Sequence, residues 1–215
     1  MANNEKSKST LVRDTICLFV ITLVAGILLG AVYQITKDPI AAQEEKVKQE
    51  AYAAVYAGAE FVSDDDVNTK LDDFQTNLTS GKVAGGENFT DVEILEVMKA
   101  LVDGADAGYV VTCTGKGYGG AVKIALGIDS EGVVKGIRIM DCSNETPGLG
   151  QNSSSEEWNK QYVGTNTSQQ LSVVKDGSGS AEAGTINSIS GATITSDAVT
   201  RAVDATFLFI TSLSE

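Results

Sequence analysis

Residues 190–196 of this chain read Ser190-Gly191-Ala192-Thr193-Ile194-Thr195-Ser196, a glycine-hinged turn rich in hydroxyl groups. After this turn the apolar side chains recur every three or four residues, which is the spacing of a helix with one buried face. They are Val199, Ala202, Val203, Phe207 and Ile210. Thr195 or Ser196 is the expected N-cap, and Asp197 in the first turn complements the helix dipole. The sequence therefore predicts a terminal amphipathic helix that starts at this turn.

Such a helix start also suits a phosphate group. The free backbone N–H groups and the positive end of the helix dipole favour an anion there. Gly191 and Ala192 leave the approach open, and Thr193 places a hydroxyl beside it. The alternative is an ordinary strand–turn–helix junction, because Ser, Thr and Gly are common at such places. The spacing alone is compatible with both interpretations.

The same run, together with two upstream segments, resembles the FMN-binding domain family. Glu145-Thr146-Pro147-Gly148-Leu149-Gly150 is similar to the Glu-Thr-Pro-Gly-Leu-Gly loop of that family. Gly117-Tyr118-Gly119-Gly120 is similar to the strand region that precedes this loop. In the family, the threonine that closes the Ser/Thr-Gly-Ala-Thr run is esterified to the phosphate of FMN. The resemblance therefore implies that Thr193 carries a covalent FMN.

The resemblance also assigns roles to the neighbouring motif residues. The corner that holds the phosphate and the ribityl chain would be formed by Ser190, Gly191, Ala192, Thr195 and Ser196. The loop against the flavin ring would be formed by Glu145, Thr146, Gly148 and Leu149. Asn187 stands three residues before the motif, where the family usually has an aspartate, and its amide keeps a hydrogen-bonding oxygen. No residue is expected to act as a catalyst or as a metal ligand.

The residue content points to an organic cofactor for any electron transfer. The chain contains no histidine, and its three cysteines, Cys17, Cys113 and Cys142, are too few for a cluster held by four thiolates. Free thiols are the expectation for Cys113 and Cys142, with a disulfide left open. A threonine hydroxyl is a poor nucleophile without a base or metal. The resemblance therefore implies an external flavin transferase, in the family an exported, magnesium-dependent enzyme that uses FAD.

Residues 15–36 form an uncharged apolar segment near the N-terminus. It is long enough to cross a hydrocarbon core about 30 Å thick. A cleaved signal peptide is the alternative, but its apolar core would be shorter and a cleavage site is not evident. Basic residues precede the segment, whereas Lys37 behind it is offset by Asp38. The positive-inside rule then predicts a single-pass protein of the cell's inner membrane, with its N-terminus in the cytoplasm and its main domain outside.

The formal net charge of −13 excludes one class of partner. An acidic surface repels nucleic acid, so no nucleic-acid binding is expected. The acidic run at residues 64–66 lacks the ligand spacing of a calcium loop and is interpreted as a solvated loop or a helix cap.

The chain order predicts four parts: a cytoplasmic N-terminus (1–14), a transmembrane helix (15–36), a stalk helix with a polar connecting region (37–90) and the FMN-binding domain (91–215). The stalk helix is expected over 40–61, and 67–90 as a surface excursion. Strands are expected over 108–114, 121–129 and 133–141, joined as two hairpins. Residues 91–102 fit either a helix or a strand, and a strand is favoured. Trp158 and Tyr162 suggest a short helix that packs back on the sheet, with a core role favoured over flavin stacking. The fold class is α+β: an antiparallel sheet flanked by helices behind one membrane helix.

Within the family, the membrane helix and the two motifs resemble the G subunits of Rnf ion-translocating electron-transport complexes. That resemblance implies an electron-carrying subunit of a complex that couples ferredoxin:NAD electron transfer to Na⁺ or H⁺ translocation. Its partners would be the other membrane and peripheral subunits. Two alternatives are a stand-alone membrane-tethered flavoprotein for extracellular electron transfer or regulation, and a non-redox anchored binding domain.

Overall fold

The structure is a computed structural model that describes residues 2–82 and 89–213, with side chains from residue 12 onward. It divides into two compact units, Met1–Val47 and Lys48–Glu215. Helix α1 (Ala2–Val55) forms the first unit and continues into the second. Its segment from Val12 is long and apolar enough to cross a membrane. The large apolar side chains between Val12 and Ile40 are exposed, as expected of a helix that needs an apolar surrounding.

The stalk helix expected over 40–61 ends earlier than the sequence suggested. Helix α1 stops at Val55, and Gly58 adopts a left-handed φ of 77°, a conformation that commonly terminates helices. The chain then enters a short strand, β1 (Glu60–Val62), which the sequence did not reveal. A three-residue strand has too few positions to show an alternating pattern.

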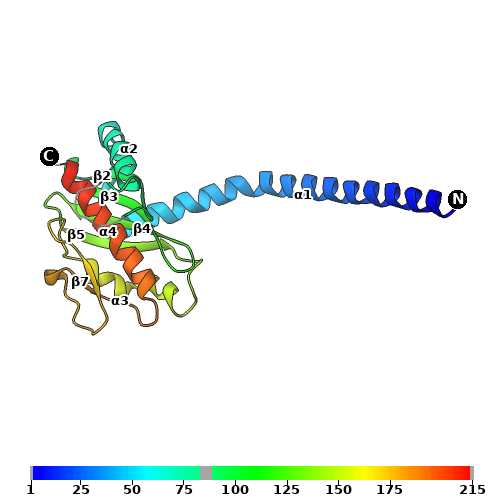
Figure 1. The fold of residues 1–215 in the computed structure, drawn as a ribbon. Helices are drawn as coiled ribbons and strands as arrows, with labels where there is room; N and C mark the ends of the chain where they lie inside the picture. Colours follow the sequence, from blue (N-terminus) through cyan, green and yellow to red (C-terminus); the bar gives the residue numbers. More distant parts are fainter. Residues whose placement is uncertain (1, 83–88, 214–215) are drawn as a thin grey trace. The chain divides into compact units, whose positions relative to one another are not determined.

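The second unit is built on a five-stranded antiparallel sheet with the order β1-β2-β3-β4-β5 (Figure 1). The longer strands are β2 (Val92–Val102), β3 (Ala105–Lys116), β4 (Ala121–Asp129) and β5 (Val134–Asp141). Each pairs antiparallel with the next, so the predicted meander is confirmed. The ambiguous stretch at 91–102 is a strand. The α+β fold class is confirmed.

Helix α4 (Thr193–Leu213) and helix α2 (Asp65–Thr79) cover one face of this sheet and share its main core. Side chains alternate between the faces along β3: Val111 and Cys113 enter this core, whereas Val110 belongs to the opposite face. The last turns of α1 cover that opposite face. Gly127 lies so close to α1 that an added Cβ would be 2.6 Å from the carbonyl oxygen of Val55. The missing side chain is what allows the helix to lie on the sheet there.

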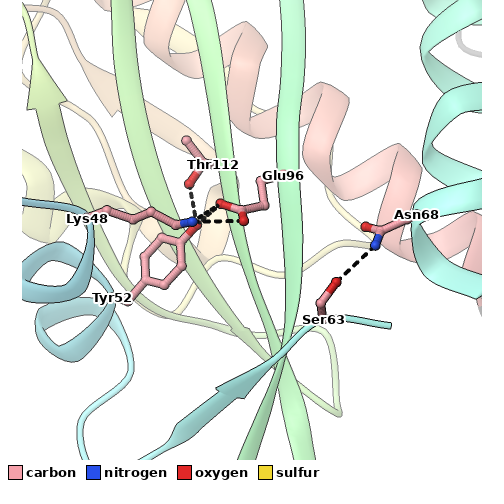
Figure 2. Close-up of polar contacts among 6 residues, drawn as sticks. All are labelled: Lys48, Tyr52, Ser63, Asn68, Glu96 and Thr112. Atoms are coloured by element: carbon pink, nitrogen blue, oxygen red, sulfur yellow. Dashed lines mark hydrogen bonds and ion pairs between the residues drawn. The ribbon is translucent and has the colours of Figure 1, made fainter. Parts of the chain in front are cut away.

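A polar network crosses this α1–sheet contact (Figure 2). Lys48 Nζ lies 2.8 Å from Glu96 Oε1, and the Tyr52 hydroxyl lies 2.8 Å from Glu96 Oε2 and 2.7 Å from Thr112 Oγ1. An irregularity in the β2–β3 register between Ile94 and Glu96 turns Glu96 toward α1. If the side chains of β2 alternated without this irregularity, the carboxylate of Glu96 would point into the apolar core on the other face of the sheet.

The surface excursion expected over 67–90 is wrong for most of its described part, since helix α2 occupies residues 65–79. Asp64 is its N-cap and accepts hydrogen bonds from the backbone N–H groups of Asp66 and Val67, so the cap interpretation of the acidic run is correct. Val67, Leu71 and Leu78 bury one face of the helix. Residues 83–88 of the expected excursion lie outside the described residues.

Short elements connect β5 to α4. They are η1 (Gly150–Ser154), α3 (Glu156–Asn159), η2 (Lys160–Tyr162), β6 (Ser172–Val174), η3 (Ala181–Ala183) and β7 (Thr185–Asn187). Strands β6 and β7 form a separate parallel pair, which the sequence did not predict. Trp158 and Tyr162 are buried in the main core, as expected: Trp158 Nε1 donates to the Asn187 carbonyl, and the Tyr162 hydroxyl pairs with Thr200.

Candidate functional site

The two sequence motifs meet at one cavity of about 550 Å³. It is lined by Tyr118, Glu145, Thr146, Leu149, Gly150, Gly191, Ala192, Thr193, Ile194 and Thr195. These residues come from the β3–β4 turn, the loop after β5 and the start of α4. The cavity has the size of a pocket for a cofactor or a small molecule.

Glu145 joins these three segments at the base of the cavity. It is buried, with 3% of its surface exposed. Its Oε1 accepts a hydrogen bond of 2.8 Å from the backbone N–H of Gly119, and its Oε2 accepts one of 2.5 Å from the hydroxyl of Thr195. Both carboxylate oxygens are therefore used inside the protein, which gives Glu145 a supporting role in addition to its place in the lining.

Glycines surround this carboxylate because there is no room for side chains. A Cβ on Gly150 would lie 2.2 Å from Glu145 Oε2, and one on Gly117 would lie 2.5 Å from Glu145 Oε1. Gly191 combines a left-handed φ of 76° with a Cβ position 3.0 Å from Leu149 Cδ2. The glycines of both motifs thus bring the two loops together and keep the space between them open.

Helix α4 begins three or four residues earlier than an N-cap at Thr195 or Ser196 implies. It starts at Thr193, and the backbone N–H of Ser196 already bonds to the carbonyl of Ala192, so Thr195 and Ser196 belong to the first turn and neither is the N-cap. Ser196 is fully buried; its hydroxyl donates to the Ala192 carbonyl and accepts from the N–H of Ile189. The hydroxyls of Thr195 and Ser196 therefore stabilise the turn and do not cap the helix.

Thr193 is the first residue of α4 and lines the cavity. The first N–H groups of a helix have no acceptor within it, so those of Thr193, Ile194 and Thr195 remain available at the cavity. Thr193 itself is half-buried. No lysine or arginine occurs among the described residues that line the cavity, so the helix terminus is the feature that would attract an anion.

Not every predicted site residue lines the cavity. Ser190 is exposed beside it, Gly148 lies in the loop after β5, and Ser196 is behind the lining. The site residues predicted from the sequence did not include Tyr118, Gly150 and Ile194, which all line it. Tyr118 could have been suspected because glycines flank a large aromatic residue in a turn, where a side chain is seldom buried.

Asn187 lies at the end of β7, outside the cavity lining. Its Oδ1 accepts a hydrogen bond of 2.8 Å from the N–H of Gly179, a contact that the family's aspartate could also make. Cys113 is buried, Cys142 is half-buried, and both are free. In the described part of the chain, no group of three or more potential metal ligands is found.

The arrangement fits a flavin mononucleotide. An open hydroxyl and free N–H groups suit a phosphate, while Leu149, Ile194 and Tyr118 offer apolar surface for a flat ring. The glycine-lined gap between the loops is the space that side chains on Gly150 and Gly191 would fill.

Comparison with known proteins agrees with this fit. A family model described as an FMN-binding domain matches residues 117–207, and one described as the RnfG N-terminal region matches residues 1–55. The chain is similar to the G subunit of the Na⁺-translocating ferredoxin:NAD⁺ oxidoreductase complex of Acetobacterium woodii, with 41% identity over 57% of this chain and 58% of that protein. It is 30% identical to the G subunit of the proton-translocating ferredoxin:NAD⁺ oxidoreductase complex of Clostridium ljungdahlii, over 93% of this chain and 91% of that protein.

Among solved structures, NqrC from Shewanella oneidensis is similar, with a TM-score of 0.46, 23% identity and coverage of 55% of this chain and 60% of that one. The similarity to the Clostridium protein extends over nearly the whole of both chains, and the two family models match in the same order as the membrane helix and the sheet domain. The chain therefore belongs to the RnfG family, the G subunits of Rnf-type ion-translocating oxidoreductase complexes.

Proposed function

We propose that this chain is the membrane-anchored flavoprotein subunit of an Rnf-type complex and that it carries FMN on Thr193 through a phosphoester. The observation that carries the proposal is the meeting of both sequence motifs at one cavity, with the Thr193 hydroxyl at the free N-terminus of α4. When bound, FMN supplies one- and two-electron chemistry, and the protein supplies binding and orientation.

Different residues of the site would bind different parts of this cofactor. The N–H groups at the start of α4 would bind the phosphate, with Gly191 and Ala192 leaving its approach open. Leu149 and Thr146 would contact the rest of the cofactor from the loop after β5. Glu145, Thr195 and Ser196 would hold these segments in register through their internal hydrogen bonds.

Attachment would require an external flavin transferase, because the chain has no histidine to activate the hydroxyl. In that reaction Thr193 Oγ1 would form a bond to the flavin-side phosphorus of FAD, its proton would be lost, and AMP would leave. Such an enzyme would act where the sheet domain lies, which we propose is outside the inner membrane, on the basis of the charge distribution around residues 15–36.

The chain would pass electrons within a complex that couples ferredoxin:NAD electron transfer to Na⁺ or H⁺ translocation. The named activities of the Acetobacterium and Clostridium relatives support this role. The partners would be the other membrane and peripheral subunits. Co-purification distinguishes this role from that of a stand-alone tethered flavoprotein. In mild detergent, the native chain should elute together with multi-spanning subunits. Elution of the flavin-loaded chain alone would contradict the assignment.

Intact mass of the full chain tests the attachment. Co-expression with a flavin transferase should raise the mass by that of FMN less one water, and peptide mapping should place the adduct on Thr193. Thr193→Val should abolish the adduct without changing the circular dichroism spectrum. Thr185→Val is the matched control, because this threonine of β7 does not line the cavity and its loss should leave the chain fully loaded. An adduct that persists in Thr193→Val would refute the linkage.

A further inference from the structure

The cavity has an apolar rim of three residues, of which the sequence motifs assign only Leu149 to the flavin ring. Tyr118 is 74% exposed, Ile194 54% and Leu149 40%, and these three residues come from three separate segments. Large apolar side chains that gather around one cavity usually mark a binding surface. The buried polar groups at the base, Glu145 and Thr195, are in contrast bonded to each other.

Tyr118 sits on a turn whose backbone is fixed. The N–H of Gly117 bonds to the carbonyl of Gly120 at 2.8 Å, and the N–H of Gly119 bonds to Glu145. A Cβ on Gly119 would lie 1.9 Å from the carbonyl oxygen of Asn144, so the turn is pressed directly onto the neighbouring loop. A rigid backbone therefore presents an aromatic side chain that the described part of the domain leaves mostly uncovered.

An exposed aromatic residue on a fixed support suits a flat ligand. Aromatic side chains stack on planar rings with little conformational-entropy cost, and the phenol gains buried area when it does so. Ile194, one residue after the attachment threonine, and Leu149 offer aliphatic surface at the same cavity. A ligand with a polar end and a flat end would use both surfaces: the polar end would bind at the N-terminus of α4, and the flat end would lie against the apolar rim.

We infer that Tyr118 is the residue that positions the isoalloxazine ring, by stacking on it at the mouth of the cavity. This inference rests on the proposed function, because it assumes that flavin is the ligand. It assigns the ring to the apolar rim and away from the buried Glu145–Thr195 pair. The ring would then be accessible to a redox partner on its outer side.

Flavin fluorescence tests the inference, because a stacked tyrosine quenches excited flavin by electron transfer and phenylalanine does not. In the full chain loaded by the transferase, Tyr118→Phe should raise fluorescence per attached flavin severalfold, with loading by intact mass unchanged. Tyr109→Phe is the matched control, since this half-buried tyrosine of β3 does not line the cavity, and its fluorescence should equal that of the wild type. Equal fluorescence of Tyr118→Phe and wild type at equal loading would overturn the role of Tyr118.

A chain without any adduct would instead refute the covalent linkage. Titration of free FMN into the full chain would then decide on Tyr118. Quenching that weakens in Tyr118→Phe supports the stacking, and identical quenching in the two proteins overturns it.

Discussion

Replacing Glu145 tests whether one buried carboxylate holds the cavity together. Its two oxygens accept from the Gly119 N–H at 2.8 Å and from the Thr195 hydroxyl at 2.5 Å, and the residue is 3% exposed. Hydrogen bonds to a charged group contribute about 1.5–3 kcal/mol each. Glu145→Ala removes both and leaves a gap, so we expect a loss of about 3–5 kcal/mol in the free energy of unfolding.

Glu145→Gln separates the hydrogen bonds from the charge. The amide oxygen can still accept from Gly119, and the amide nitrogen can donate to Thr195 if that hydroxyl reorients. Because both contacts survive in neutral form, the expected loss is only about 1–2 kcal/mol. Thr195→Val removes one of the two contacts, and its effect should be smaller when combined with Glu145→Ala than on its own, because the residues share one bond.

Urea unfolding of the flavin-free full chain in detergent measures these losses. Trp158 is the only tryptophan and is buried in the main core, so its fluorescence reports on the sheet domain. A loss below about 1 kcal/mol for Glu145→Ala would refute the supporting role of the carboxylate. Equal losses for the alanine and glutamine variants would show that the amide cannot replace the carboxylate at these two contacts.

Three further changes test other parts of the domain. Tyr52→Phe removes the hydroxyl from the network around Glu96 and should cost about 1–2 kcal/mol in urea unfolding. Burial raises the pKa of the Cys113 thiol to about 12, so Ellman's reagent at pH 8 should leave it unmodified until denaturant is added, and fast labelling of the native chain at that peptide would contradict its burial. The hydrogen bond from Lys99, followed by that from the N–H of Val67, lowers the pKa of Asp64. The ionised form of Asp64 therefore stabilises the fold above about pH 3.9, and this contribution is lost as the pH falls through the lower pKa of the folded state. The free energy of unfolding of Asp64→Asn should therefore fall less between pH 6 and pH 3 than that of the wild type.

The sequence predicted the sheet well because its strands carry a strong local pattern. Residues 121–129 match β4 at both ends, since alternating apolar residues and a turn at Gly132 mark it clearly. Helix α2 was missed although Val67, Leu71, Phe74 and Leu78 recur at helical spacing. The aspartate, asparagine and threonine residues between them lower helix propensity and concealed the period.

The sequence identified most of the residues that line the cavity, but it did not reveal the contacts between them. Motif residues from two distant segments do line one cavity, but the hydrogen bond between Glu145 and Thr195 joins residues that no local pattern relates. The same contact explains the error at the start of α4. Thr195 or Ser196 was expected to cap the helix, yet both hydroxyls are used in other contacts and the helix starts at Thr193.

The residues of the site thus form two groups, those whose side chains are hydrogen-bonded inside the protein and those whose side chains line the cavity. Glu145 and Ser196 form hydrogen bonds inside the protein, whereas Thr193, Tyr118 and Ile194 line the cavity. Substitutions in the first group should therefore lower stability and disturb the cavity indirectly. Substitutions in the second group should change the attachment or the fluorescence of the flavin while leaving the unfolding free energy near that of the wild type. A motif that looks uniform in sequence would then contain two classes of residue, and measuring stability, flavin content and flavin fluorescence on the same variants would separate them.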